Sequence, residues 1–232
     1  MTTIGFIGSG RIGGALAQLA VAAGHDIVLS NSRGPESLRE MVARLGSRAR
    51  AGTITEAAAA GDLVVVTIPI RAYRQVPVEP LRGRVVIDTL NYDPERQGAV
   101  PEIEVGDVPA PLLLQAHLGD AYVVKAFSTV FFRHLPELAR PVGAADRSAV
   151  PIAGDSAAAK AAVAALIDSL GFDAYDVGPL SEGWRYQRDT AAYAALYSSG
   201  RGGVWPPEGS RRVDAAFLQQ QLEAAQRYRD MA

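Results

Sequence analysis

The first residues of the chain that could do chemistry form a glycine-rich turn. The pattern G-x-G-x-x-G is present as Gly8-Ser9-Gly10-Arg11-Ile12-Gly13. It follows an apolar segment directly and opens an amphipathic one, so Gly8 would allow a tight turn, Gly10 would let the backbone approach a pyrophosphate, and Gly13 would let a helix pack on a strand. The free N–H groups at the start of that helix would hold the anion. The motif predicts a dinucleotide site, and the alternative is a tight turn without a ligand.

The residues about 20 positions further on decide which dinucleotide fits. An acidic side chain there would bind the ribose 2′-hydroxyl of NAD, but the sequence reads Ser30-Asn31-Ser32-Arg33. Hydroxyl groups and a guanidinium suit a 2′-phosphate, because arginine binds two phosphate oxygens and hydroxyl groups add no negative charge. Asp26 begins the same predicted strand and lies at the wrong end to reach a ribose. We expect NADP(H) rather than NAD(H), the alternative being a solvated turn with an incidental Arg33.

A substrate would lie beside the nicotinamide, at the carboxyl ends of further strands. Ile68 and Pro69 would give an apolar wall and free carbonyl groups beside the ring, and Asn91 would hold the carboxamide or a ribose. Each has a structural alternative, since Pro69 could only end a strand and Asn91 could only stabilise a turn.

Three side chains are candidates for proton transfer to a reduced product: Tyr92, Lys125 and His134. Lys125 is one of only two lysines and ends an apolar segment, so a partly buried ammonium there could bind an anion or donate a proton. A structural ion pair with an acid such as Asp88 is an equal alternative. His134 could instead cap the helix in which it is predicted to lie.

The composition excludes several other kinds of chemistry. The 232 residues include no cysteine, so redox chemistry would need a bound cofactor, and the three histidines lie too far apart to suggest a metal site. Positive side chains number 23 and negative ones 25, without a basic stripe, so we expect neither nucleic acid nor a membrane as partner. Because no leader-like segment and no long apolar run is seen, we expect a cytoplasmic location.

The elements that must position these residues follow an alternation of β-branched segments with alanine- and leucine-rich ones. Strands are predicted at residues 3–7, 25–29, 47–51, 63–68, 85–87, 122–127, 150–153 and 172–177. Helices are predicted at residues 11–23, 35–45, 55–60 and 156–170, the last capped by Asp155. The alternation predicts an α/β fold, a doubly wound parallel sheet of the Rossmann type with helices on both faces.

Two regions are expected along the chain. Residues 1–180 would form the nucleotide-binding domain, and residues 181–232 a helical C-terminal extension. In the extension, stretches of helical character at residues 182–198 and 213–231 are separated by glycine and proline residues. We expect the extension to serve packing, a pocket, or contact in a homodimer.

Several of these segments resemble the F420-dependent NADP oxidoreductase family. They are residues 4–16, Ser32-Arg33, Asp88-Thr89-Leu90-Asn91, residues 123–129 and residues 172–180. The resemblance implies that NADP(H) is held by Ser9, Arg11, Ile12, Ser32 and Arg33. It also implies that hydride passes between the nicotinamide and coenzyme F420, a deazaflavin stacked against it. In such a reaction the protein need only align the two rings.

Two other functions stay open. Tyr92 and the aromatic residues of the extension, Trp184, Tyr186 and Trp205, could build a pocket for a small imine, carbonyl or alkene. The chain would then be an NADPH-dependent reductase that takes its proton from Tyr92, Lys125 or His134. Alternatively, it could be a catalytically silent sensor that binds NADP(H) and reports its redox state to a protein partner.

Overall fold

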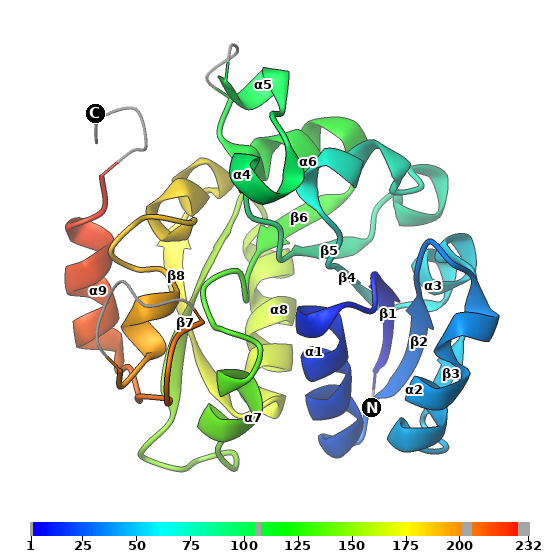
Figure 1. Cartoon of the computed structure of the whole chain (residues 1–232), viewed down its shortest axis with the longest axis horizontal. Helices are drawn as coiled ribbons and strands as arrows, with labels where there is room; N and C mark the ends of the chain where they lie inside the picture. Colours follow the sequence, from blue (N-terminus) through cyan, green and yellow to red (C-terminus); the bar gives the residue numbers. More distant parts are fainter. Residues whose placement is uncertain (1, 105–107, 201–205, 227–232) are drawn as a thin grey trace.

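The computed structural model describes residues 2–104, 108–200 and 206–226, and one sheet forms its centre (Figure 1). The strands are β1 (Thr3–Ile7), β2 (Asp26–Ser30), β3 (Ala49–Ala51), β4 (Leu63–Val66), β5 (Val85–Asp88), β6 (Tyr122–Lys125), β7 (Ser148–Gly154) and β8 (Phe172–Gly178). Their order in space is β3-β2-β1-β4-β5-β6-β7-β8. The predicted Rossmann-type α/β fold is confirmed.

The α-helices of the described residues lie between and around these strands. They are α1 (Arg11–Ala22), α2 (Arg39–Leu45), α3 (Ile54–Ala60), α4 (Pro94–Gln97), α5 (Pro101–Glu104), α6 (Ala110–Leu118), α7 (His134–Leu138), α8 (Ala157–Ser169) and α9 (Ala215–Glu223). Short 3-10 helices are η1 (Pro35–Leu38), η2 (Ile70–Gln75), η3 (Glu79–Leu81), η4 (Leu180–Tyr186) and η5 (Ala194–Tyr197). None of the helices in the described part of the chain is long and apolar enough to cross a bilayer.

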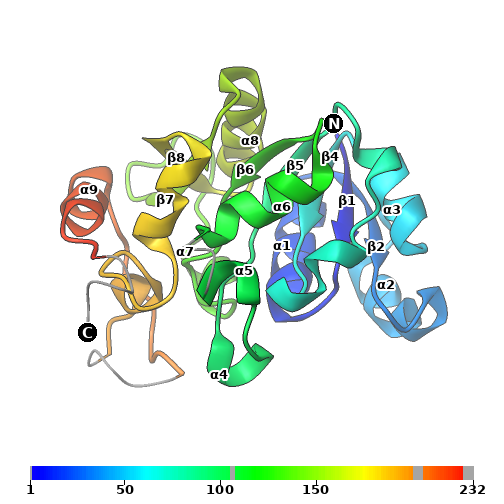
Figure 2. The ribbon, with the colours of Figure 1, turned by 90° about the horizontal axis from the view of Figure 1, so that it is seen from above.

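The sheet separates two apolar cores, because successive side chains of a strand point to opposite faces. On one face, Phe6 of β1 packs with α1, α7 and α8. On the other, Ile7 packs with α3, α6 and η2. The views of Figures 1 and 2 place α9 at the opposite end of the molecule from α2 and α3. Burial on both faces explains why the central strands are short continuous apolar runs.

The prediction that the whole sheet is parallel is wrong at one pairing, that of β6 with β7, and because β8 is parallel to β7 these last two strands run opposite to β1–β6. β7 runs antiparallel to β6, and the pairing joins Ala153 and Gly154 to the last two residues of β6. A strand parallel to β6 would need a connection that crosses back to the amino-terminal edge of the sheet. The antiparallel β7 needs no such crossover.

The C-terminal extension is less helical than predicted. Residues 182–198 contain only the 3-10 helices η4 and η5, and within 213–231 the helix α9 ends at Glu223. Trp205 and residues 227–231 lie outside the described residues. The extension is fastened by two buried tyrosines: the Tyr186 hydroxyl donates to the Lys125 carbonyl at 3.0 Å, and the Tyr197 hydroxyl donates to the Ala149 carbonyl at 2.8 Å.

The predicted cap of helix α8 is one residue off. Ser156 is the cap, and its Oγ accepts a hydrogen bond from the Ala159 amide at 3.2 Å. The Asp155 carboxylate instead accepts from the Leu180 amide at 2.9 Å. Asp155 therefore helps to position the start of the extension.

Candidate active site

Two adjoining cavities open at the carboxyl ends of the strands. The glycine-loop cavity has a volume of about 630 Å³, and its walls are formed by residues 7–10, 31–33, Ile54, 67–69 and three residues of η2. The strand-end cavity has a volume of about 350 Å³, and its walls are formed by residues 10–12, 67–69, 89–91, 93, 96–97, 127–132, 188 and 193–194. Both cavities are lined by Gly10, Thr67, Ile68 and Pro69. One extended ligand could therefore occupy both.

The glycine turn after β1 is pressed against the end of β4. Gly8 has φ +107°, and a Cβ atom at this position would lie 2.3 Å from the Thr67 carbonyl oxygen. A Cβ atom at Gly13 would lie 2.5 Å from the Gly8 carbonyl oxygen, whereas one at Gly10 would meet nothing within 4 Å. Gly8 and Gly13 thus permit close packing, while Gly10 leaves open space above the backbone. This fits the approach of a pyrophosphate to the turn.

Helix α1 begins at this turn with its backbone donors available. Its cap is Gly10, which provides no side-chain hydrogen bond, and its first turn contains no acidic residue. The first N–H groups of a helix have no partners within the helix. At the edge of the two cavities they are suited to hold an anion.

The residues predicted to hold the nucleotide at the end of β2 differ in whether they line a cavity. Ser30 is fully buried and its hydroxyl donates to the Phe6 carbonyl at 2.7 Å, so it lies outside both cavities, as does Gly13. Asn31 lines the glycine-loop cavity and shapes the turn, since its Oδ1 accepts from the Arg33 amide at 2.9 Å. Ser32 and Arg33 are exposed along the same cavity.

Asp26 lies at the opposite end of β2 from this turn. Its carboxylate pairs with Arg48 at 3.1 Å. It is therefore not available to bind a ribose at the end of the strand, as the sequence predicted.

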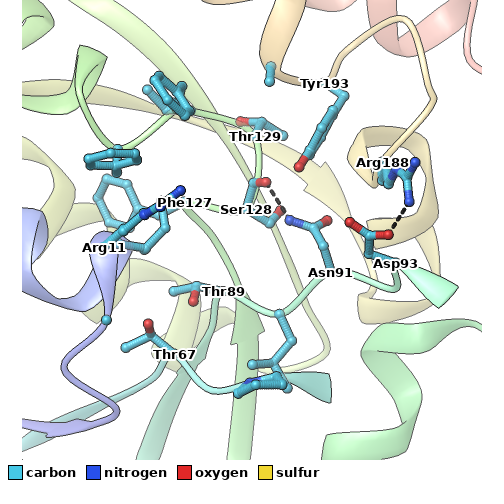
Figure 3. Close-up of a pocket in the computed structure, with 18 of the residues that line it drawn as sticks. Arg11, Thr67, Thr89, Asn91, Asp93, Phe127, Ser128, Thr129, Arg188 and Tyr193 are labelled. Atoms are coloured by element: carbon cyan, nitrogen blue, oxygen red, sulfur yellow. Dashed lines mark hydrogen bonds and ion pairs between the residues drawn. The ribbon is translucent and has the colours of Figure 1, made fainter. Parts of the chain in front are cut away.

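Asn91 and Ser128 bring unpartnered polar atoms to the strand-end cavity (Figure 3). The Asn91 amide nitrogen donates to the Ser128 carbonyl at 2.7 Å, which holds the loop after β5 against the loop after β6. The Asn91 Oδ1 and the Ser128 Oγ are buried and have no hydrogen-bond partner among the described residues. Buried polar atoms are normally hydrogen-bonded, so a water molecule or a ligand in the cavity would satisfy these two.

The extension contributes Arg188 and Tyr193 to the same cavity (Figure 3). Arg188 pairs with Asp93, and also with Glu95 at 3.0 Å. In Figure 3 the hydroxyl of Tyr193 points towards Asn91 and Ser128, and it makes no hydrogen bond within the described chain. Burial raises the pKa of Tyr193, although Arg188 partly opposes this, so the phenol stays protonated at neutral pH.

Lys125 lies outside both cavities. It is 1% exposed, its Nζ donates to the Leu90 carbonyl at 2.6 Å, and the Asp88 carboxylate lies 3.7 Å away. Burial lowers the pKa of Lys125 and raises the pKa of Asp88, while their mutual attraction opposes both shifts. Asp88 also accepts from the Leu90 amide at 2.7 Å. The pair therefore fixes the backbone that carries Asn91, which is the structural alternative weighed for Lys125.

Tyr92 and His134 also lie outside both cavities. The Tyr92 hydroxyl donates to Glu104 and accepts from the Val100 amide at 3.4 Å. His134 is 2% exposed at the start of α7, with its ring against Phe131, and burial lowers its pKa. The structure thus brings none of the three predicted proton donors into either of these two cavities.

Sequence reasoning assigned no role to several residues that line the cavities. They are Thr67, Arg71, Gln75, Thr89, Asp93, Arg96, Ser128, Thr129, Arg188 and Tyr193. Thr67 lies near the end of the predicted strand 63–68, Thr89 two residues after the strand 85–87, and Ser128 directly after the strand 122–127, so their position could have been found. Arg188 and Tyr193 lie in irregular segments with no such signal.

Comparisons with known proteins find a matching family model and similar solved structures. A family model described as NADP oxidoreductase, coenzyme F420-dependent, matches residues 3–92. The structure of a hypothetical protein from Sinorhizobium meliloti is 31% identical, with a TM-score of 0.69 over 79% of this chain and 89% of that one. No curated protein matches the sequence.

Two further solved structures share the fold at lower identity. One, from Arthrobacter sp. FB24, has the provisional name F420-dependent NADP-reductase; it is 24% identical, with a TM-score of 0.66 over 78% of this chain and 86% of that one. The other is an imine reductase from Myxococcus stipitatus, 21% identical, with a TM-score of 0.53 over 78% of this chain and 56% of that one.

Proposed function

The chain belongs to the family of coenzyme F420-dependent NADP oxidoreductases, and from this premise we propose that it transfers hydride between NADP(H) and coenzyme F420 in the strand-end cavity. The observation that carries the proposal is the junction of the two cavities at Gly10, Thr67, Ile68 and Pro69. This junction would let the phosphates lie in the glycine-loop cavity while the nicotinamide enters the strand-end cavity.

The glycine-loop cavity would hold the adenosine and phosphate half of NADP(H). Gly10 and the first N–H groups of α1, together with Ser9, Arg11 and Ile12, would bind the pyrophosphate. Ser32 and Arg33 would bind the 2′-phosphate, and Asn31 would keep their turn in shape.

The strand-end cavity would hold the nicotinamide, which supplies or accepts the hydride when NADP(H) is bound. Ile68 and Pro69 would form the apolar wall, and the unpartnered Oδ1 of Asn91 would accept a hydrogen bond from the carboxamide. The buried Lys125–Asp88 pair would hold Asn91 in place through Leu90. These residues would act by alignment, because hydride passes between two carbon atoms.

The aromatic residues of the strand-end cavity support a planar partner. Phe127, Phe131 and Phe132 all line it, and the Arg11 guanidinium lies 5.5 Å from the Phe132 ring centroid. Flat apolar walls of this kind suit a heteroaromatic ring system such as a deazaflavin.

A second candidate function is supported by Tyr193. An imine or carbonyl takes hydride at carbon and a proton at nitrogen or oxygen, so its reduction needs a proton donor in the cavity. Tyr193 has a protonated hydroxyl without a hydrogen-bond partner at this place, whereas Tyr92, Lys125 and His134 do not line the cavity. On this reading the chain is an NADPH-dependent reductase of a small imine or carbonyl.

One set of assays separates these functions. The purified protein is given NADPH with either F420 or the cyclic imine 1-pyrroline, and the absorbances of NADPH and F420 are followed. We expect both absorbances to fall together with F420. No turnover of F420 at saturating concentrations would overturn the leading proposal. Tight NADPH binding in calorimetry without reduction of either acceptor would favour the sensor.

The variant Tyr193→Phe tests the second candidate in the same assay. If 1-pyrroline is the better acceptor, its turnover should fall about 100-fold or more in this variant, because a positioned acid contributes that much. Tyr175→Phe is the matched control, since Tyr175 lies on β8 outside both cavities. Equal rates in wild type and Tyr193→Phe would rule out Tyr193 as the proton donor.

A further inference from the structure

We propose that Arg71 and Arg33 form a two-arginine site for the 2′-phosphate of NADP(H), and that Arg71 is a specificity-determining residue for the cofactor. The resemblance to the family implied a role for Arg33 but none for Arg71. The proposal depends on NADP(H) binding alone and not on which acceptor takes the hydride.

The sheet topology brings the two arginines to one cavity from opposite sides. β1 lies between β2 and β4, and it pairs with both in parallel. The glycine turn follows β1, Arg33 follows β2, and Arg71 follows β4 as the second residue of η2. Both arginines line the glycine-loop cavity. A ligand above the glycine turn would therefore lie between them.

Neither guanidinium is neutralised by the protein. Within the described residues, the side chains of Arg33 and Arg71 take part in no ion pair and no hydrogen bond, and no Asp or Glu lines the glycine-loop cavity. Arg74, one turn further along η2, shows the contrast, because it pairs with Glu102 at 2.5 Å. Two uncompensated positive charges across a cavity favour an anion with more than one charge.

A phosphomonoester carries more charge on one group than either phosphate of a dinucleotide's pyrophosphate, each of which has a single negative charge. It carries about −1.5 to −2 charges at neutral pH and three acceptor oxygens, enough for two guanidinium groups. Ser32 and Gln75 line the same cavity and offer neutral donors, which add no repulsion to the anion. The pyrophosphate already has the first turn of α1 as its site.

Calorimetry with NADP⁺ and NAD⁺ tests the assignment without any hydride acceptor. We expect Arg71→Ala to weaken NADP⁺ binding about 10- to 100-fold, the range of a hydrogen bond to a charged group, and to change NAD⁺ binding less than about twofold. Arg74→Ala is the matched control and should change neither dissociation constant. Arg71→Gln, which keeps the size and polarity of the side chain, should resemble Arg71→Ala.

Two results would overturn the proposal. Equal weakening of NADP⁺ and NAD⁺ would mean that Arg71 contacts the adenine or the pyrophosphate, and unchanged NADP⁺ binding would mean that it faces solvent. The thermal unfolding midpoint of each variant checks that it is folded. Because binding is measured, failure of F420 as hydride acceptor would leave this result unaffected.

Discussion

The two cavities are built in different ways. The glycine-loop cavity is formed mainly by short segments that directly follow β1, β2 and β4, three neighbouring strands of the sheet. The strand-end cavity also needs the loops after β5 and β6 and two residues of the extension, Arg188 and Tyr193. The family model matches residues 3–92 and so includes every residue that lines the first cavity but only part of the second. The cavity proposed for the cofactor is therefore local and lies within the segment that the family model matches, while the cavity proposed for the hydride partner depends on the rest of the chain.

The largest effect should come from the buried pair beneath the strand-end cavity. Lys125→Met leaves Asp88 as an unpaired buried carboxylate, so we expect the free energy of unfolding to fall by about 3–5 kcal/mol in urea denaturation. The control is Lys160→Met, because Lys160 pairs with the half-exposed Asp176 at 2.8 Å and should contribute about 1 kcal/mol or less. Similar losses in both variants would contradict a special role for the buried pair.

Arg33→Ala should separate NADPH from NADH. We expect the dissociation constant of NADPH to rise about 10- to 100-fold and that of NADH to change much less, because only NADPH has the 2′-phosphate. Adenosine 2′,5′-bisphosphate, which lacks the nicotinamide, should be weakened as much as NADPH. Equal losses for NADPH and NADH would refute the assignment of Arg33.

Asn91→Leu should weaken the binding of NADPH through the strand-end cavity and leave binding in the glycine-loop cavity unchanged. Leucine is similar in size to asparagine but has no hydrogen-bonding group. We therefore expect the dissociation constant of NADPH to rise roughly two- to tenfold. Binding of adenosine 2′,5′-bisphosphate should stay as in the wild type. A weaker bisphosphate complex would show that the two cavities are not independent.

The smallest effect concerns α3, which packs against β1 beneath the glycine turn. Thr53 and Glu56 form a capping box at its start, and the backbone N–H of Thr53 lowers the pKa of Glu56 from 4.5. A carboxyl group with a lowered pKa stabilises the fold above its unfolded pKa and loses that contribution as the pH falls through its folded pKa. Stability should thus decline more steeply below pH 4.5 in wild type than in Glu56→Gln, measured by urea denaturation at several pH values.

The sequence could predict features that depend on neighbours along the chain. The turn at residues 8–13 and the residues at 31–33 lie in space as their spacing suggests, because each directly follows a strand. The direction of β7 could not be predicted, since a buried strand has the same apolar pattern in either direction. The direction of the Lys125 side chain could not be predicted either. The apolar pattern places Lys125 at the end of a strand, but it does not show that the side chain turns towards the Leu90 carbonyl.

The contribution of the extension could not be predicted for a different reason. Arg188 lies between η4 and η5, and Tyr193 directly precedes η5, so no helical or strand periodicity indicates where their side chains point. Their position depends on packing between distant segments. At Gly183, for example, a Cβ atom would lie 2.8 Å from the Lys125 side chain and 2.9 Å from Pro111.

The tyrosine hydrogen bonds from the extension to β6 and β7 tie the extension to the sheet. A fragment that stops before Tyr186 would leave the Lys125 and Ala149 carbonyl groups without these donors and would open voids the size of two aromatic rings. Grafting the tail of a relative onto this nucleotide domain would meet the same obstacle unless both phenols were kept. We therefore expect substitutions that change the extension without loss of stability to preserve these two anchors.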